Sequence, residues 1–385
     1  MKLIYLHFPI VLVFCLLSVS CHQKGKSRSD DYELKESGEK LIFKLDDRTK
    51  NLPAMSSLYI DKDGREYFTF QKMGQNSIMF YDIATGEFAL EVKPAVEGPD
   101  GVAFFHGYAI KSLDSIFLAS LAREEISLID RNAKLKDGFY YGLTDDSIEI
   151  HPNAFRSKTY NAPLFVDNTM YFMPTNNRHS EHRPMCILIN LTTRSVRALA
   201  GLSYPDFPGW DNKAKSYGFE QNVSRDFNGK EFVYAFHFDE DIYIVSMDHS
   251  SIERVKVKSR YVDKINLPDD YGNLTAEDLC ANPNYGNLLY DKYRNVYYRI
   301  AHPATEIEKD IKGGELLQYG RKNFSIILLD KDFNIIGETL FPDYTYNSGV
   351  MFIREDGLYI SDSHYLNPEY SDDVLSFRRF VVQRK

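Results

Sequence analysis

The segment NNRHSEHRP, residues 176–184, holds the side chains most able to do chemistry in this 385-residue chain. His179 and His182 lie three residues apart with a carboxylate between them, so they could form half of a zinc site. The H-x-x-H order lacks the helical i, i+4 spacing of a zincin. Without that spacing, the segment fits an enlarged polar surface loop better than a metal centre.

Other catalytic signatures are weak. The sequence has no G-x-S-x-G, and no serine or cysteine has a recognisable histidine partner. The acidic stretch DKDG, residues 61–64, has its glycine in the fourth position, whereas a calcium loop needs it in the sixth. Asp, Asn and Gly favour tight turns, so this stretch predicts a turn between two strands. We predict no catalytic residue, although residues drawn from distant segments would leave no local motif.

The elements that would position such side chains recur along the chain. One sequence pattern appears six times: a hydrophobic strand, an acidic turn, a second strand centred on an aromatic residue, and often further strands. The first copy reads SLYIDKDGREYFTF followed by SIMFYDIATGEFALEV. The aromatic anchors of the second strands are Tyr67, Phe117, Tyr171, Tyr243, Tyr297 and Tyr359.

Six units of about four short strands predict an all-β fold, a six-bladed β-propeller over residues 39–385. A seven-bladed ring with one degenerate repeat, or a β-sandwich, stays open because the interval from Tyr171 to Tyr243 could hide strands. The segment Lys40–Asp46 precedes the first unit and could add an outer strand to the last blade. That addition would close the ring and remove exposed strand edges.

The N-terminus predicts export. A short basic start and an apolar run, Leu3–Leu17, precede small residues, which describes a signal peptide over residues 1–20. The run is shorter than the roughly 20 residues of a membrane span. LLSVSC resembles the lipobox of bacterial lipoproteins, in which Cys21 would carry the lipid; an ordinary signal peptide is the alternative. Residues 21–38 are polar and are predicted to be a flexible tether.

Composition narrows the partners. The formal net charge of −9 argues against nucleic acid, since phosphate binding depends on Lys and Arg. Cys186 and Cys280 would remain beside Cys21 after processing, and no C-x-x-C pair exists. Cys186 lies in the strand-like MCILIN and is most simply interpreted as a small buried residue, although a bridge to Cys280 stays open.

The lipobox, the six repeats and phrases such as YAFHFDEDIYIV and ILLDKDFNIIGET resemble a family of uncharacterised envelope lipoproteins of Bacteroides-type bacteria with six-bladed propellers. The resemblance covers nearly the whole chain and rests on loose hydrophobic patterns. It implies a propeller held in the bacterial cell envelope by a lipid anchor, in the outer membrane, with the periplasmic or surface face left open. It implies no activity and no catalytic residues.

In a propeller, the loops after the second strands share a face with the connectors between blades, and function concentrates on loops. The long loops here are Thr175–Pro184, His302–Asn323 and His364–Asp373. The candidate ligand-binding residues on this face are His179, His182, Trp210, His302, His364, Asn161, Asn287 and Asn347.

Two functions follow as hypotheses. The first is a lipid-anchored binding or scaffold module for a peptide, glycan or protein, with no cofactor. The second is a propeller hydrolase or lactonase with a divalent metal at the channel mouth, where the three asparagine oxygens could hold calcium. Trp210, in a connector with other aromatics, could stack on a ligand or pack within its own loop.

Overall fold

The computed structural model describes residues 27–53, 55–72, 74–120, 124–150, 161–174, 182–204, 223–265 and 275–385. The signal peptide, Cys21, His179 and Trp210 lie outside the described residues. None of the helices in the described part is long and apolar enough to cross a membrane.

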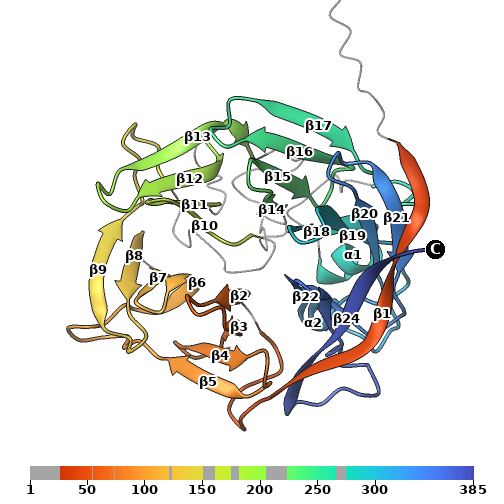
Figure 1. The fold of residues 1–385 in the computed structure, drawn as a ribbon, viewed down its shortest axis with the longest axis horizontal. Coiled ribbons are helices and arrows are strands. Elements are labelled where there is room, and N and C mark those ends of the chain that lie inside the picture. The colour runs from red at the N-terminus through yellow and green to blue at the C-terminus, as the bar shows by residue number, and fades with distance from the viewer. Residues whose placement is uncertain are drawn as a thin grey trace, which may run out of the picture.

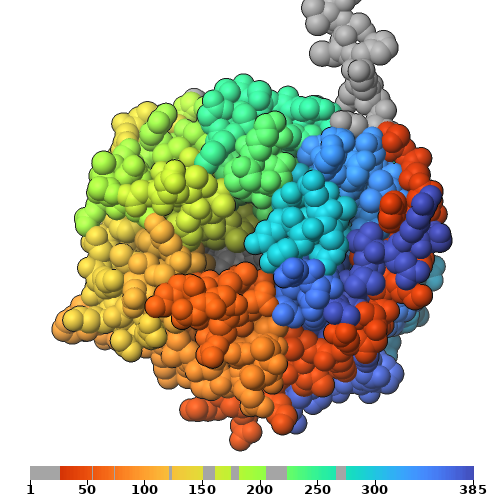
Figure 2. Space-filling view, in the orientation of Figure 1, coloured from red at the N-terminus to blue at the C-terminus, as the bar shows by residue number. Residues whose placement is uncertain are grey.

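Sheets of short antiparallel strands are arranged around a ring, with the first strand of each unit innermost (Figure 1). Figure 2 shows that the ring is hollowed at its centre. Four of the sheets contain four strands each. Their members are β2 (Ser56–Ile60), β3 (Glu66–Gln71), β4 (Ile78–Asp82) and β5 (Phe88–Val92); β6 (Phe105–Ser112), β7 (Ser115–Ser120), β8 (Glu125–Ile129) and β9 (Leu135–Tyr140); β10 (Leu164–Val166), β11 (Thr169–Phe172), β12 (Pro184–Asn190) and β13 (Val196–Ser203); and β14 (Val223–Phe227), β15 (Glu231–Phe236), β16 (Asp241–Ser246) and β17 (Ile252–Lys256).

The fifth sheet has eight strands in the order β18-β19-β20-β21-β1-β24-β23-β22. Its members are β18 (Asn284–Asp291), β19 (Val296–His302), β20 (Ser325–Leu329), β21 (Ile335–Leu340), β22 (Asn347–Arg354), β23 (Gly357–Ser361), β24 (Val374–Arg384) and β1 (Arg28–Lys44). The all-β, propeller-like arrangement is therefore confirmed. Hydrogen bonding does not give six separate sheets, because β1 joins two groups of strands into one.

Strand β1 closes the ring as predicted, and it does more. Lys40–Lys44 pair antiparallel with β24, which confirms the closing strand. The strand begins at Arg28, however, and its N-terminal part pairs with β21 as well. The prediction of a tether over residues 21–38 is therefore wrong for residues 28–38. Leu34 is buried among mostly exposed or half-buried polar residues, and this segment pairs with two neighbouring strands, β24 and β21.

The hydrophobic core lies between neighbouring sheets. Period-2 alternation puts one face of each strand against the next sheet around the ring. Val233 and Ile242, on β15 and β16, pack in one cluster with Tyr285, Tyr297 and Ile327 of the following strands. Because each sheet buries both faces in this way, its central strands are nearly continuous apolar sequence.

The register of the fourth unit differs from the prediction. Five of the six aromatic anchors lie on second strands, but Tyr243 lies on β16, the third strand of its sheet. Tyr234 on β15 holds the equivalent position and pairs directly with Tyr243. The strand that the repeat search missed is β14, with the sequence VSRDF, which carries Ser224, Arg225 and Asp226.

Two local predictions concern turns and cysteines. Oδ1 of Asp61 accepts hydrogen bonds from the backbone N–H groups of Asp63 and Arg65, both at 2.9 Å, so DKDG is a turn between β2 and β3. Cys186 and Cys280 are both buried free thiols. Each therefore packs as a small apolar residue, as predicted for Cys186.

Candidate functional site

Two short helices that the sequence pattern did not predict stand beside the long loops. They are α1 (Ala276–Ala281), in the connector before β18, and α2 (Gly313–Tyr319), in the loop between β19 and β20. We call these helices, with the loop of residues 362–373 between β23 and β24, the loop platform. Neither helix reaches two full turns, which is too short for a helical period to show in the sequence.

A capping box starts α1. The Thr275 hydroxyl accepts a hydrogen bond from the Asp278 backbone N–H at 3.0 Å, and the Asp278 carboxylate accepts one from the Thr275 backbone at 3.1 Å. Both bonds satisfy N–H groups that a helix start leaves free. The helix then buries Leu279 and Cys280 against the ring.

Removing this cap is expected to loosen the platform. Thr275→Ala deletes the accepting hydroxyl and should cost about 1 kcal/mol of unfolding free energy. Urea unfolding would measure that loss, and amide hydrogen exchange in α1 would locate it. Thr275→Ser keeps the hydroxyl and should behave like the wild type. Equal stability of the Ala and Ser variants would contradict a capping role.

Helix α2 packs on α1 through a glycine. The Gly313 N–H donates to Oε1 of Glu277 at 3.0 Å, and a Cβ at Gly313 would lie 2.5 Å from the Glu277 backbone nitrogen. No other residue permits this approach without a shift of one helix. The connector and the loop after the second strand therefore do share one face, as the topology predicted.

His302 lies beneath the helices and is buried. Its Nδ1 is 3.3 Å from Oδ1 of Asn284, and its Nε2 is 3.2 Å from the hydroxyl of Ser348. Asn284 in turn donates to the carbonyl of Leu279 in α1 at 3.0 Å. Burial, with Arg321 and His237 nearby, holds the pKa of His302 well below its usual value. The ring is therefore neutral at pH 7 and joins α1, β18 and β22.

His364 plays a similar part under α2. Its Nε2 donates to the carbonyl of Gly320 at 2.9 Å, and its Nδ1 accepts from the N–H of Leu366 at 3.2 Å. The ring stacks on Tyr365 at a centroid distance of 5.2 Å. Burial lowers the pKa of His364 to about 4. Both predicted histidines thus lie in the platform, but buried and bonded, so they hold the loops together rather than face a ligand.

The three predicted asparagines have different surroundings. Asn287 and Asn347 are buried, and their amides donate to the carbonyls of Ser348, at 3.4 Å, and Gln318, at 3.1 Å. Those bonds tie the innermost strands to each other and to α2. Asn161 lies before β10, and its buried Oδ1 has no donor among the described residues. His182, two residues before the start of β12, is exposed.

Arg321 was not singled out by the sequence. It follows α2, is buried, and donates through Nη1 to the carbonyl of Leu279. Burial lowers its pKa to about 10, so it keeps its charge at pH 7. Nothing in the sequence around RKN distinguishes this arginine from an exposed one. Across the described ranges, no group of three or more His, Cys, Asp or Glu residues could hold a metal ion.

Comparisons with known proteins agree with this architecture. A crystal structure of a DUF4221 member from Bacteroides vulgatus is 24% identical and superposes with a TM-score of 0.79, covering 93% of this chain and all of that chain. A protein of Bacteroides fragilis described as exported superposes with a TM-score of 0.53 at 11% identity, covering 94% of this chain and 99% of its own. No curated protein matches the sequence. The model of the DUF4221 domain of unknown function matches residues 31–340, so this chain, with its propeller-like all-β fold, belongs to the DUF4221 family, for which no activity is established.

Proposed function

We propose that the protein is a lipid-anchored binding module of the bacterial cell envelope, which uses the loop platform to dock a peptide, glycan or protein partner. The observation that carries the proposal is the platform itself. Its exposed helices rest on buried, hydrogen-bonded histidine and asparagine side chains, which fix them in one arrangement. A rigid surface loses little conformational entropy on binding, which is how preorganised sites gain affinity.

The scaffold proposed for this surface is a six-bladed propeller. Strands β18–β21 form one four-stranded group, and β22, β23, β24 and β1 form another. Counting these groups as blades that share an edge at β1 gives two blades beside the four separate sheets. A ring whose sheets have only short edges suits a secreted scaffold, because exposed strand edges promote aggregation.

Anchoring by lipid at Cys21 is part of the proposal, with the outer membrane as the location. The lipobox-like LLSVSC supports it, and so does the exported relative from Bacteroides fragilis. Replacing Cys21 with serine should release the protein from the membrane fraction while leaving its thermal unfolding unchanged. Mass spectrometry of the wild-type N-terminal peptide should show the acyl chains. Absence of acyl chains from the wild-type protein would refute the lipid anchor but would not bear on the proposed binding surface.

Site-specific photo-cross-linking tests the binding surface. A diazirine amino acid at the exposed Gln318 of α2, introduced in cells, should yield a discrete cross-linked species. The matched control is Asp332, which is exposed in the turn at the other end of β20. Equal cross-linking from both positions, or none from Gln318, would contradict a partner at the platform.

A further inference from the structure

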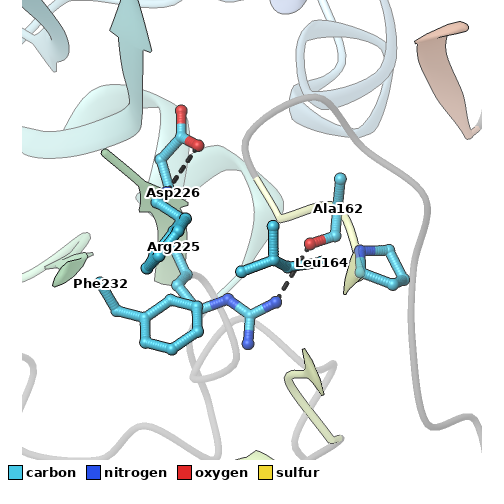
Figure 3. Close-up of a pocket in the computed structure, with 7 residues that line it drawn as sticks. Ala162, Leu164, Arg225, Asp226 and Phe232 are labelled. Atoms are coloured by element: carbon cyan, nitrogen blue, oxygen red, sulfur yellow. Dashed lines mark hydrogen bonds between the residues drawn. The ribbon is translucent and has the colours of Figure 1, made fainter. Parts of the chain in front are cut away.

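A pocket of about 110 Å³ lies between β10 and β14, and its lining residues are not those of the loop platform. Its walls come from two neighbouring sheets and combine apolar side chains with the charged residues Arg225 and Asp226 (Figure 3). The lining residues are Ala162, Pro163, Leu164, Arg225, Asp226, Phe227 and Phe232.

Adjacent residues of β14 point to opposite sides, as strand geometry requires. Asp226 points toward β18, where its Oδ2 accepts the Tyr290 N–H at 2.6 Å and its Oδ1 accepts the N–H of Phe227 at 2.8 Å. Arg225 points the other way, across the pocket toward the carbonyl of Ala162 (Figure 3). The carboxylate of Asp226 is therefore occupied on the far side of the strand and does not pair with Arg225.

Arg225 is only 3% exposed, and among the described residues its acceptors are uncharged. Nη2 donates to the carbonyls of Ala162 at 3.0 Å and Tyr171 at 3.4 Å, and Nη1 lies 3.5 Å from Sγ of Cys186. The guanidinium also stacks over Phe232 at 5.0 Å from the ring centroid. A buried guanidinium normally pairs with a carboxylate, because an unbalanced charge in the interior is costly.

Three described titratable groups near the guanidinium of Arg225 are neutral at pH 7. Burial raises the pKa of the Cys186 thiol and raises that of Tyr234 well above its usual value, so both stay protonated at pH 7. His249, 2.8 Å from the Tyr234 hydroxyl, has a pKa lowered to about 4 by burial and is neutral. Among the described residues, the carboxylate of Asp226 acts on the charge of Arg225 from the other side of β14, and no hydrogen bond joins the two.

Arg299 is the useful contrast. It is fully buried too, and it binds the backbone carbonyls of Asp239, Glu240 and Val257. The carboxylates of Asp239, Glu240 and Asp241 act on its charge, so it is balanced within the protein. Arg299 thus serves as a structural link between two sheets, with three carboxylates acting on its charge, whereas among the described residues Asp226 alone is found to act in this way on Arg225.

We propose that this pocket binds a small carboxylate, which pairs with Arg225 while its short apolar body lies against Leu164 and Phe232. The planar guanidinium matches a carboxylate in shape and charge. The volume equals about four water molecules at roughly 30 Å³ each, which suits a group of about five non-hydrogen atoms. The carboxylate could belong to a free organic acid or to the C-terminus of a peptide.

Calorimetric titration of the purified chain with sodium propionate tests the site, with propionamide as the neutral isostere and sodium chloride as the salt control. Propionate should bind saturably, and propionamide should not. Arg225→Gln should weaken propionate binding at least about tenfold, which corresponds to 1.4 kcal/mol. Arg194→Gln, at an exposed arginine on β12–β13, should leave binding unchanged.

Leu164→Trp fills the pocket while keeping Arg225, so it decides the outcome if Arg225→Gln does not fold. Loss of propionate binding in Leu164→Trp supports the site. Equal binding of propionate and propionamide, absence of saturable binding by the wild type, or binding that survives both substitutions would overturn it. N-acetylalanine, which ends in a free carboxylate as a peptide does, and its amide distinguish the two sources. If the ligand is a peptide C-terminus, N-acetylalanine should bind as propionate does.

Discussion

Acidification from pH 7 to pH 5 is expected to lower the free energy of unfolding by about 3 kcal/mol or more, because the fold buries neutral histidines. His249 and His364 have pKa values near 4, and that of His302 is well below its usual value. In the unfolded chain each histidine binds a proton near pH 6.5. Protons therefore favour the unfolded state as the pH falls from about 6.5 toward 4.

The sizes follow from linkage. A histidine whose pKa falls from 6.5 to about 4 loses about 2 kcal/mol of stabilisation by pH 5, so His249 and His364 together lose about 4. His302 acts in the same direction. Burial raises the pKa of Asp226 to about 6, and this group acts oppositely, returning about 1 kcal/mol as it gains its proton. The sum is large against a typical domain stability of 5–15 kcal/mol.

Urea unfolding at pH 7, 6 and 5 measures the effect. His364→Gln provides the control, because its amide can still donate to Gly320 but does not titrate. That variant should be less stable at pH 7 yet lose about 2 kcal/mol less than the wild type on going to pH 5. A wild-type free energy of unfolding that is flat between pH 7 and pH 5 would refute the account of buried neutral histidines.

The sequence predicted repeats and strand order better than it predicted burial. Alternating apolar strands and Asp-Gly turns are local signals, so the units and the closing segment Lys40–Asp46 could be identified directly. β14 could not, since its buried polar side chains Ser224 and Asp226 accept hydrogen bonds from the N–H groups of Leu288 and Tyr290 in the next group of strands. Such partners lie more than sixty residues away and leave no local pattern.

The candidate site was also predicted in part, because the sequence indicated which loops share a face but not which of their side chains are buried. The topology rule placed His302 and His364 correctly on the loop face, because loop positions follow from strand order. Whether a histidine there faces a ligand or fills an interior depends on what the loop packs against. Here α1 and α2 cover the imidazole rings of His302 and His364, and both helices are too short to be predicted from periodicity. The cation in the inter-sheet pocket, Arg225, lies on the strand that the repeat search missed.

Substitution of Gly337 by alanine is expected to destabilise the protein by about 3 kcal/mol, by forcing β1 away from β21. A Cβ at Gly337 would lie 1.9 Å from the backbone oxygen of Tyr32. Backbone cannot yield as the end of a flexible side chain can, so one strand must shift. The pairing of Arg28 with Ile335 would weaken along with the ion pair between Arg28 and Glu338.

Gly314 gives the matched control for this substitution. It lies in α2, and a Cβ added there would have no atom within 4 Å, so Gly314→Ala should be neutral or slightly stabilising. Urea unfolding compares the two variants, and limited proteolysis near Tyr32 reports release of the strand. Equal stability of the two variants, with Tyr32 protected in both, would show that β1 does not depend on this close contact.

The position of β1 also limits how far the ring can lie from an anchor at Cys21. Seven residue steps separate Cys21 from Arg28, which span at most about 25 Å when fully extended. A ring of this chain length is roughly 50 Å across by the size scaling of compact domains. The rim near β1 and β21 would then stay close to the bilayer. In Gly337→Ala, release of the strand from β21 would lengthen that tether, so a fluorophore at Asp332 should be quenched less by labelled lipid than in the wild type.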